Sequence, residues 1–359
     1  MAQGAKSVET LEALGIVSGD EAARLRPVAE RYELLVNRYY LSLIDLDDPE
    51  CPIRRQAIPA LAELLDTPGE ARDPIGDKSH SPTPLLVHRY PDRALLFPTF
   101  RCPMFCRFCF RKVSLNEEKI RLREELPATI DYLRAHPEIQ EVILSGGDPL
   151  LLSTARLREL FSALREAGVP RLRLHSRVPV TLPQRIDEEL AALFKAAQPL
   201  FLICHFNHPK ELTAEATAGL QLLADAGVPL LNQSALLRGV NAEPSCLREL
   251  SEGLLRRRVT PYYLHHPDLT PGTQHFRVSL REGRSISRAL QGQLSGLGCP
   301  RYVIDIPGGG GKVPVDSAWV TEGERPSRWH LTSPLTGEVY EYDDLAELGI
   351  RSADADGAR

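Results

Sequence analysis

The sequence lacks the long apolar runs and the charge excess that would direct a chain to a membrane or a nucleic acid. No stretch of about 18 consecutive apolar residues occurs, so a membrane-spanning helix is excluded. Residues Met1–Lys6 are polar and no apolar segment follows them, and we therefore expect no secretory signal. The formal net charge is only −5 over 359 residues, which gives no support for a nucleic-acid or membrane partner.

Cysteine is sparse and unevenly spread. The chain has seven cysteines, an odd number, of which four are scattered: Cys51, Cys204, Cys246 and Cys299. The other three fall within eight residues, whereas a disulfide framework would be spread more evenly. Because clustered cysteines in a chain of this size more often bind metal, we predict a metal site and a reducing, cytoplasmic location.

What the sequence does contain is a regular alternation of short apolar runs and amphipathic stretches. From Arg93 onward six apolar runs predict strands, and they are Ala94–Phe97, Glu141–Leu144, Leu172–His175, Leu200–Cys204, Leu230–Leu237 and Pro261–Leu264. The stretches between them predict helices, among them Thr154–Ala167, Asp187–Lys195 and Ala214–Ala226. Serial strand–helix units favour an α/β fold whose parallel sheet closes into a barrel or partial barrel. In such barrels the chemistry lies on the loops that follow the strands.

The two ends of the chain differ from this pattern. Residues 8–48 have the apolar spacing of helices, and residues 66–84 are rich in Pro, Asp, Gly and Ser, as loops are. We therefore predict three parts: an N-terminal helical extension over residues 1–84, the barrel over residues 85–298, and a C-terminal segment over residues 299–359.

The clustered cysteines are Cys102, Cys106 and Cys109, just after the first predicted strand, with the spacing Cys-x3-Cys-x2-Cys. Three thiolates on one loop can bind three corners of a four-iron cluster. The fourth iron then has no protein ligand and can bind a small molecule, as catalytic metals do at an open position. A zinc site is the alternative, but zinc requires a fourth ligand near by, and none is obvious.

This spacing, in this position, resembles the radical S-adenosylmethionine (SAM) superfamily. The resemblance implies that a [4Fe–4S] cluster binds SAM, which one electron then cleaves to a 5′-deoxyadenosyl radical. Ser145, Gly146, Gly147 and Asp148 follow the second predicted strand, and glycines at a strand end let a ligand approach the backbone. At this distance from the cysteines, the four residues resemble the superfamily's loop for the methionine amino group of SAM.

A second motif lies towards the C-terminus, where four glycines, Gly308–Gly311, precede Lys312. A phosphate-binding P-loop requires Ser or Thr after the lysine and the start of a helix, and Val313 and Pro314 meet neither requirement. A lysine on a glycine loop can instead form an imine with an aldehyde cofactor. The residues alone leave that interpretation open.

The segment Pro307–Lys312 resembles the loop of the lysine 2,3-aminomutase family whose lysine binds pyridoxal 5′-phosphate (PLP). The likeness runs from about residue 30 to residue 316, and further segments carry it: His88–Arg93, His175–Ile186, His205–Pro209 and Asn232–Asn241. The resemblance implies a radical SAM partial (β/α)6 barrel of the TIM type, a C-terminal segment with the PLP lysine, and transfer of an amino group between adjacent carbons of an amino acid.

The resemblance also assigns cofactor residues. It implies that Arg89 and Arg93 serve the PLP site, since a phosphate is bound well by guanidinium donors, and that Tyr90 packs on the pyridine ring. It implies that His205 and Gln233 line the SAM and PLP pockets. Surface salt bridges for the two arginines, and a core position for Tyr90, remain alternatives.

Three further residues match the family's substrate contacts. Arg111 matches the arginine that holds the substrate carboxylate, which a guanidinium binds through two parallel hydrogen bonds. Asp268 and Asp305 match two carboxylates that bind the distal ammonium of lysine. Asp305 lies in an apolar run, where an unpaired carboxylate is costly and its pKa would be raised. A solvated Arg111 and a turn role for Asp268 are the alternatives.

The sequence departs from the family in two places. Clostridial-type enzymes have a Cys-rich C-terminal tail that binds zinc between subunits, whereas no cysteine follows Cys299 here. We therefore expect no zinc, and a possible homo-oligomer would use another interface. The family often has Tyr three residues before the first substrate Asp, where this chain has His265, as in the branch that modifies lysine for elongation factor P.

These observations predict a radical SAM, PLP-dependent isomerase that converts L-lysine to β-lysine, with Lys312 as the catalytic lysine. An electron donor such as flavodoxin or ferredoxin is an expected partner. The alternatives are an arginine or glutamate 2,3-aminomutase and the elongation factor P branch. A non-catalytic iron–sulfur scaffold is disfavoured, because a scaffold has no need of an imine-forming lysine.

Overall fold

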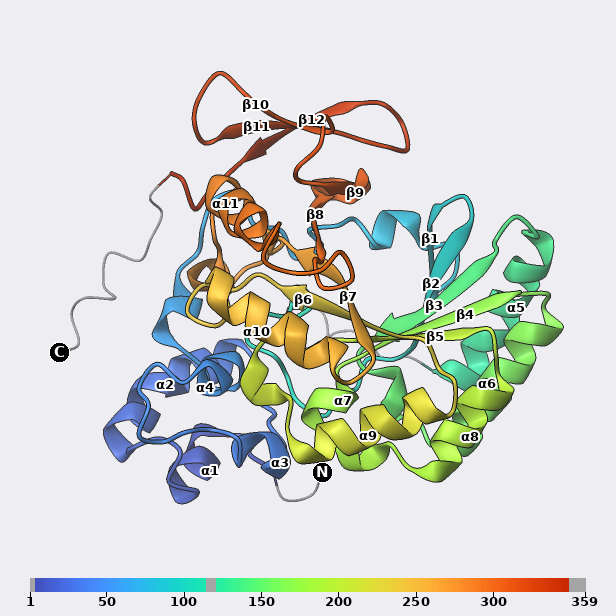
Figure 1. Ribbon diagram of the computed structural model, residues 1–359, viewed down its shortest axis with the longest axis horizontal. Coiled ribbons are helices and arrows are strands. Elements are labelled where there is room, and N and C mark those ends of the chain that lie inside the picture. The colour runs from blue at the N-terminus through green and yellow to red at the C-terminus, as the bar shows by residue number, and fades with distance from the viewer. Residues whose placement is uncertain (1–3, 114–120, 349–359) are drawn as a thin grey trace.

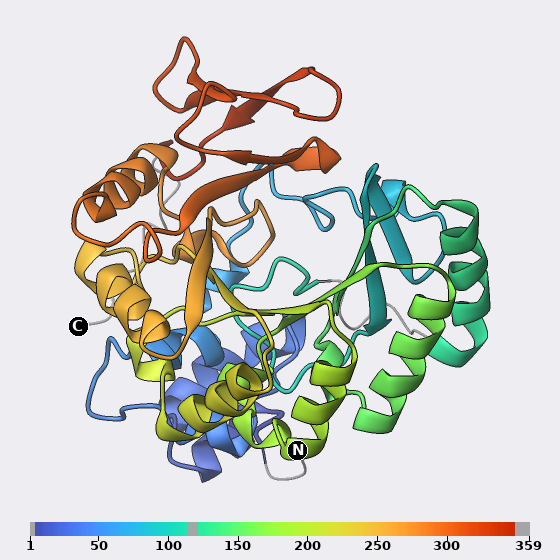
Figure 2. The same ribbon diagram turned by 45° about the vertical axis from the view of Figure 1, so that its right-hand side comes forward.

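The computed structural model describes residues 4–113 and 121–348, and its main feature is a curved sheet of nine strands in chain order (Figures 1 and 2). The strands are β1 (Leu86–Tyr90), β2 (Arg93–Thr99), β3 (Glu141–Gly146), β4 (Arg171–Ser176), β5 (Leu200–Cys204), β6 (Leu230–Ala235), β7 (Val259–His265), β8 (Arg301–Ile306) and β9 (Gly311–Pro314). Strands β2 to β8 are parallel to one another, and β1 and β9 run antiparallel at the two edges. Within the described residues the two edge strands are not paired, so the sheet forms an open barrel.

Helices cover the outer face of this sheet (Figure 2). They are α5 (Leu122–Ala135), α6 (Thr154–Glu166), α7 (Val178–Thr181), α8 (Glu188–Ala196), α9 (Ala214–Asp225), α10 (Pro244–Leu255) and α11 (Leu280–Leu290). Several begin at a side chain that accepts a backbone N–H, such as Ser153 before α6 and Thr213 before α9. The six predicted strands are confirmed as β2 to β7, and the three predicted helices as α6, α8 and α9.

Alternation along the strands decides which side chains face the barrel interior. In β4, Leu172 and Leu174 are fully buried, whereas Arg173 and His175 are half-buried and line the interior cavity. Successive side chains of a strand point to opposite faces, so the apolar set packs against the helices and the polar set is left for the site.

The barrel extends past the predicted boundary at residue 299. Strand β8 starts at Arg301 and continues the parallel sheet, and β9 then turns back along it and carries Lys312. A second, three-stranded antiparallel sheet follows, formed by β10 (Val320–Glu322), β11 (Arg328–Thr332) and β12 (Val339–Asp343). Its buried Trp329 shares one apolar core with residues of β8 and β9. This sheet was not predicted from the sequence.

The N-terminal extension packs near the α7 and α9 side of the barrel (Figure 1). Its helices are α1 (Val8–Ala13), α2 (Gly19–Arg31), α3 (Arg38–Leu41) and α4 (Pro52–Ala57). Apolar residues of all four belong to the main hydrophobic core of the barrel. Over residues 4–113 and 121–348, no helix combines the length and the apolar character needed to cross a membrane.

Candidate active site

A cavity of about 870 Å³ occupies the interior of the barrel. Every residue that the sequence analysis assigned to the cluster, to SAM, to PLP or to the substrate lines this one cavity. Many of them stand at or just after the carboxyl ends of parallel strands, the place where barrels carry their chemistry. Four segments far apart in the chain therefore meet here: the cysteine loop, the glycine loop after β3, the end of β7, and β8–β9.

The cysteine loop follows β2 and is fastened to the N-terminal extension. Phe105 donates its backbone N–H to Leu35 at 2.7 Å, and Arg107 donates its backbone N–H to the Gln56 carbonyl at 2.9 Å. Burial, together with nearby Asp148 and the other two cysteines, raises the pKa of Cys102 well above its ordinary value. Burial and nearby Cys106 raise the pKa of Cys109 to about 11. The three thiols are therefore close enough to influence one another.

The three cysteines share the wall of the cavity. All three cysteines are free and half-buried, and all three face the cavity. Among the residues that the structure describes, no group of three His, Cys, Asp or Glu side chains is arranged to hold one metal ion. Three thiols at the wall of a large cavity leave room for a four-iron cluster and a small molecule on its open iron.

The glycine loop after β3 lies directly on the start of the cysteine loop. A Cβ atom on Gly147 would come within 2.4 Å of the Arg101 carbonyl oxygen and the Phe100 carbonyl carbon. The backbone N–H of Asp148 also donates to the Arg101 carbonyl at 2.8 Å. Only glycine permits this approach, which brings the proposed SAM loop against the cysteines.

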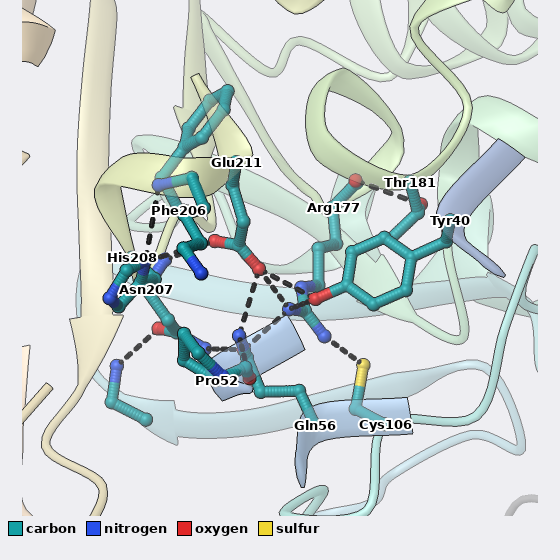
Figure 3. Close-up of polar contacts among 12 residues, drawn as sticks. Tyr40, Pro52, Gln56, Cys106, Arg177, Thr181, Phe206, Asn207, His208 and Glu211 are labelled. Atoms are coloured by element: carbon teal, nitrogen blue, oxygen red, sulfur yellow. Dashed lines mark hydrogen bonds and ion pairs between the residues drawn. The ribbon is translucent and has the colours of Figure 1, made fainter. Parts of the chain in front are cut away.

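The Asp148 carboxylate accepts hydrogen bonds from residues at the end of β4. It accepts the Ser176 hydroxyl at 2.8 Å and the backbone N–H of Arg177 at 2.8 Å. Burial raises the pKa of Asp148 to about 6, although these hydrogen bonds lower it. Asp148 thereby fixes the backbone of Arg177, whose side chain donates to the Cys106 sulfur (Figure 3).

The glycine loop before Lys312 has a backbone that other residues would strain. Gly308, Gly309 and Gly311 all have positive φ, and a Cβ atom on Gly309 would come within 2.5 Å of the His80 ring. The turn places the Lys312 amine in an ion pair with Asp305 and 3.1 Å from Nδ1 of His265. The backbone N–H of Lys312 donates to the Tyr90 hydroxyl at 2.7 Å.

Asp268 and Asp305 have opposite electrostatic surroundings. Burial acts to raise the pKa of Asp305, but Lys312 and His265 outweigh burial and hold that pKa below its ordinary value. The raised pKa expected of an unpaired Asp305 does not arise here, because Lys312 on the neighbouring strand pairs with its carboxylate. Burial and the charge of Asp305 raise the pKa of Asp268 to about 7, and no cation among the described residues forms an ion pair with it.

Two of the predicted arginines share one carboxylate that the sequence analysis did not single out. Asp77 pairs with Arg89 at 2.9 Å through one oxygen and with Arg111 at 2.6 Å through the other. The Arg89 side chain is only 7% exposed, so its pair is not a surface salt bridge. Arg111 also lies over the rings of Phe97 and Phe110. Asp77 stands in the stretch interpreted only as a loop, and nothing in its local sequence marked it.

Arg93 and Tyr90 form a unit at the edge of the cavity. The Arg93 guanidinium lies 3.6 Å from the centre of the Tyr90 ring and pairs with Asp92 at 2.7 Å. His205, whose pKa burial lowers to about 3, and Gln233 on β6 also line the cavity. Several buried ring or guanidinium nitrogens along the cavity have no partner within the described residues, namely Nε of Arg177 and Nε2 of His175, His205 and His265. Buried donors and acceptors left in this way fit a site that is completed by polar ligands.

Comparisons with known proteins agree with this geometry. The model of the radical SAM superfamily matches residues 96–245, from β2 to the start of α10. L-lysine 2,3-aminomutase of Clostridium subterminale is 44% identical over 312 residues, which cover 86% of this chain and 75% of that protein. A putative L-lysine 2,3-aminomutase of Aquifex aeolicus is 42% identical and covers 87% of this chain and 85% of that protein. Glutamate 2,3-aminomutase of Clostridioides difficile is 37% identical and covers 96% of this chain and 81% of that protein.

The barrel, the cysteine loop, the lysine loop and these relatives lead to one assignment. The chain belongs to the lysine 2,3-aminomutase family and is a radical SAM aminomutase, an isomerase whose cofactors are a [4Fe–4S] cluster, SAM and PLP.

Proposed function

We propose that this enzyme is an L-lysine 2,3-aminomutase that moves the α-amino group of lysine to C3. The observation that carries the proposal is the pair Asp268 and Asp305 on the cavity that also holds Arg111. Two neighbouring carboxylates, one with a pKa raised by burial and by the charge of the other, favour a ligand that brings a positive charge to them. Lysine carries such a charge at the end of its side chain, and glutamate does not.

We assign different residues of the cavity to the cluster and to SAM. We assign the cluster to Cys102, Cys106 and Cys109, and SAM to the loop Ser145–Asp148 with His205 and Gln233. When bound, the cluster and SAM supply a carbon-centred radical, and PLP supplies a conjugated ring that spreads an unpaired electron. These assignments follow the family resemblance and the shared cavity.

The PLP and substrate side is assigned to the opposite strands. Lys312 is the lysine that binds PLP covalently, and Arg89, Arg93 and Tyr90 stand where they can hold its phosphate and ring. Arg111 binds the substrate carboxylate, for which it exchanges part of its interaction with Asp77.

Substrate binding also rearranges charges within the cavity. The Lys312 amine now neutralises Asp305, and PLP binding would remove that charge from the amine. The ε-ammonium of lysine would then replace it between Asp305 and Asp268. The substrate ammonium thus gives the two carboxylates a positive partner in the substrate complex, which avoids a buried unpaired charge there.

Partners and architecture remain part of the proposal. We infer a cytoplasmic enzyme that receives its electron from a low-potential donor such as flavodoxin or ferredoxin. Any homo-oligomer would form through an interface without zinc. We also propose that the helical extension before residue 85 and the segment after residue 298 serve the barrel rather than acting as separate domains, because both share its apolar cores.

An anaerobic assay decides the substrate. The chain is reconstituted with iron, sulfide and PLP, and SAM, dithionite and one of lysine, arginine or glutamate are added. We expect the highest kcat/KM for lysine and conversion to β-lysine. Arginine as the best substrate would keep the role of the two aspartates and change the substrate, whereas glutamate as the best substrate would contradict that role. Absence of turnover together with a stable cluster would favour a scaffold.

A further inference from the structure

A buried guanidinium contacts the cluster loop from the side of β4. Arg177 follows β4 directly, and its NH1 group donates to the Cys106 sulfur at 2.6 Å (Figure 3). Its side chain is 8% exposed, so water does not screen this contact effectively. Arginine remains charged in proteins, and the sulfur of Cys106 therefore faces a permanent cation.

The rest of the guanidinium is held by three oxygens on the other side. Its NH2 group donates to Gln56 Oε1 and to Glu211 Oε1, each at 2.7 Å, and lies 3.2 Å from the Tyr40 hydroxyl (Figure 3). A planar guanidinium that is bound at both ends cannot turn away from the sulfur without breaking these hydrogen bonds.

The supporting residues are themselves fixed. Glu211 is fully buried, and it accepts the Tyr40 hydroxyl at 2.8 Å and the Gln56 amide at 3.1 Å. Its second oxygen accepts the backbone N–H of Asn207 at 2.6 Å. A buried polar network in which each member has partners holds one geometry, so this network sets where the Arg177 charge lies.

The network joins parts of the chain that are distant in sequence. Tyr40 lies on α3 and Gln56 on α4, both in the N-terminal extension, whereas Glu211 follows β5. The backbone of Arg177 is held separately by Asp148, from the loop after β3. The N-terminal helices therefore complete the surroundings of the cluster cysteine, in addition to covering the barrel.

A cationic donor on a cluster thiolate has a defined electrical effect. Reduction adds one electron from the external donor to the cluster core, which changes from 2+ to 1+ and makes the whole group more negative. Hydrogen bonds and positive charge near the sulfurs stabilise the more negative state and raise the reduction potential. Nε of Arg177, which has no partner within residues 4–113 and 121–348, is a further donor on the same guanidinium.

We propose that Arg177 is a positioning residue that raises the reduction potential of the cluster through Cys106, with Tyr40, Gln56 and Glu211 as the platform that aims it. The proposal rests on the assignment of the three cysteines as cluster ligands. It adds a role for the N-terminal extension, which supplies two of the three supporting side chains.

The test is a redox titration of the reconstituted protein without SAM or PLP, followed by electron paramagnetic resonance of the reduced cluster. The variants are Arg177→Gln, which removes the charge, Arg177→Lys, which keeps a charge but loses the fork, and Tyr40→Phe, which removes one support. The matched control is Arg165→Lys, because Arg165 bonds only backbone carbonyls, at Val169, Ala197 and Pro199. Iron and sulfide are measured for every protein.

We expect the midpoint potential to become more negative in the order Tyr40→Phe, Arg177→Lys, Arg177→Gln. For Arg177→Gln the equilibrium constant for reduction should fall about tenfold, which is about 59 mV for a one-electron couple. The control should keep the wild-type potential. If Arg177→Gln fails to bind iron, the other two variants still carry the test, and their shift supports the proposal.

An unchanged potential in Arg177→Gln at full iron content would overturn the proposal, because that variant removes the charge. If Arg177→Gln binds no iron, unchanged potentials in both Arg177→Lys and Tyr40→Phe would overturn it, because a purely structural role does not predict any shift. A wild-type chain that binds no cluster is a different result: it contradicts the assigned cysteine ligands. The iron content of the wild-type protein distinguishes these two failures before any variant is titrated.

Discussion

At the scale of single residues, Asp268 and Asp305, the two carboxylates proposed to bind the substrate, illustrate how neighbours decide the state of a side chain. Asp305 stands opposite Lys312 in the antiparallel pair of β8 and β9, so a cation faces it across the ladder. Asp268 lies in the loop after β7 and meets mainly the charge of Asp305. The same residue type therefore has a lowered pKa at one position and a raised pKa at the other.

Replacing Asp305 tests whether it binds the substrate ammonium. Asp305→Asn should weaken lysine binding by about 2–5 kcal/mol, the cost of truncating one partner of a buried charge pair. The dissociation constant can be measured through the spectral change of bound PLP as lysine is added. The exposed Glu324→Gln serves as the control, and an equal effect on glutamate binding would contradict the assignment.

The raised pKa of Asp268 predicts a pH dependence of binding. Burial and Asp305 raise this pKa to about 7, while Lys312 and Arg111 lower it and Asp77 raises it. Asp268 must be ionised to bind the ammonium, so lysine affinity should increase as the pH rises towards 8, by at most about tenfold per pH unit. Asp268→Asn should lose the part of the pH dependence of lysine affinity that is due to Asp268. The titration of free lysine contributes equally for the wild type and the variant. An unchanged slope in the variant would show that another group titrates.

The raised pKa of Asp268 also makes the stability of the unliganded protein depend on pH. This stability decreases as the pH rises, whereas the affinity for lysine increases. The folded protein holds the Asp268 proton more tightly than the unfolded chain, whose carboxyl titrates near its ordinary value of 3.8. The stability that this proton contributes is complete below that value and is lost as the pH rises through about 7. Asp268→Asn should therefore gain stability relative to the wild type between pH 5 and 8, as thermal unfolding at several pH values can check.

Lys312 is not the only lysine in the interior, which makes its assignment testable. Burial lowers the pKa of Lys112 to about 8, but Lys112 is tied to Glu63 and to the Gly272 carbonyl and does not line the cavity. Borohydride reduction with PLP should therefore attach the label to Lys312, with Lys112 unlabelled in peptide mass mapping. Lys312→Ala should lose the label and the aminomutase reaction while it retains some SAM cleavage. A label on Lys112 would reject the assignment.

At the scale of elements, contacts between loops determine the geometry of the site as much as the strands do. The loop after β3 meets the cysteine loop at Gly147 with no room for a side chain. Gly147→Ala should push the two loops apart and reduce iron bound after reconstitution to less than half, with the barrel still folded. Iron content and circular dichroism measure the two effects. Gly296→Ala is the control, because a Cβ there meets nothing within 4 Å. Full iron binding by the Gly147 variant would argue against close contact of these loops.

The C-terminal sheet is the other element with a consequence for the site. Trp329 on β11 is fully buried, and it packs in one core with Ile304, Ile306 and Val313 of β8 and β9. Trp329→Ala should destabilise the protein by about 3–5 kcal/mol, as measured by denaturant unfolding. Since β8 and β9 carry Asp305 and Lys312, PLP content should fall further than iron content. Equal loss of PLP and iron would mean that Trp329 does not support the PLP site separately from the cluster site.

At the scale of the whole molecule, the sheet order explains why the motifs meet. Seven parallel strands in chain order bring the loop after β2 and the loop after β7 to the same end of one barrel. The antiparallel β9 then returns Lys312 to that cavity. The two ends of the chain add the helical platform under Cys106 and the small sheet behind β8 and β9. The site thus draws on all three parts predicted for the chain.

The sequence by itself determined the strand and helix pattern from β2 to β7, the cysteine spacing and the two glycine loops. These features depend on residues close together in the chain: an alternation of period two, three thiols within eight residues, and glycines where a loop needs them. The family resemblance then supplied the expected roles of Arg111, Asp268 and Asp305, which no local pattern marks.

Only the tertiary structure decided which charges meet. Asp77 between Arg89 and Arg111, the ion pair of Lys312 with Asp305, and the contact of Arg177 with Cys106 all join segments separated along the chain. Their strength comes from burial in a shared cavity, where a charge must find a partner or lose its ionisation. This requirement depends on which residues are neighbours in three dimensions, and the spacing of residues along the sequence does not indicate it.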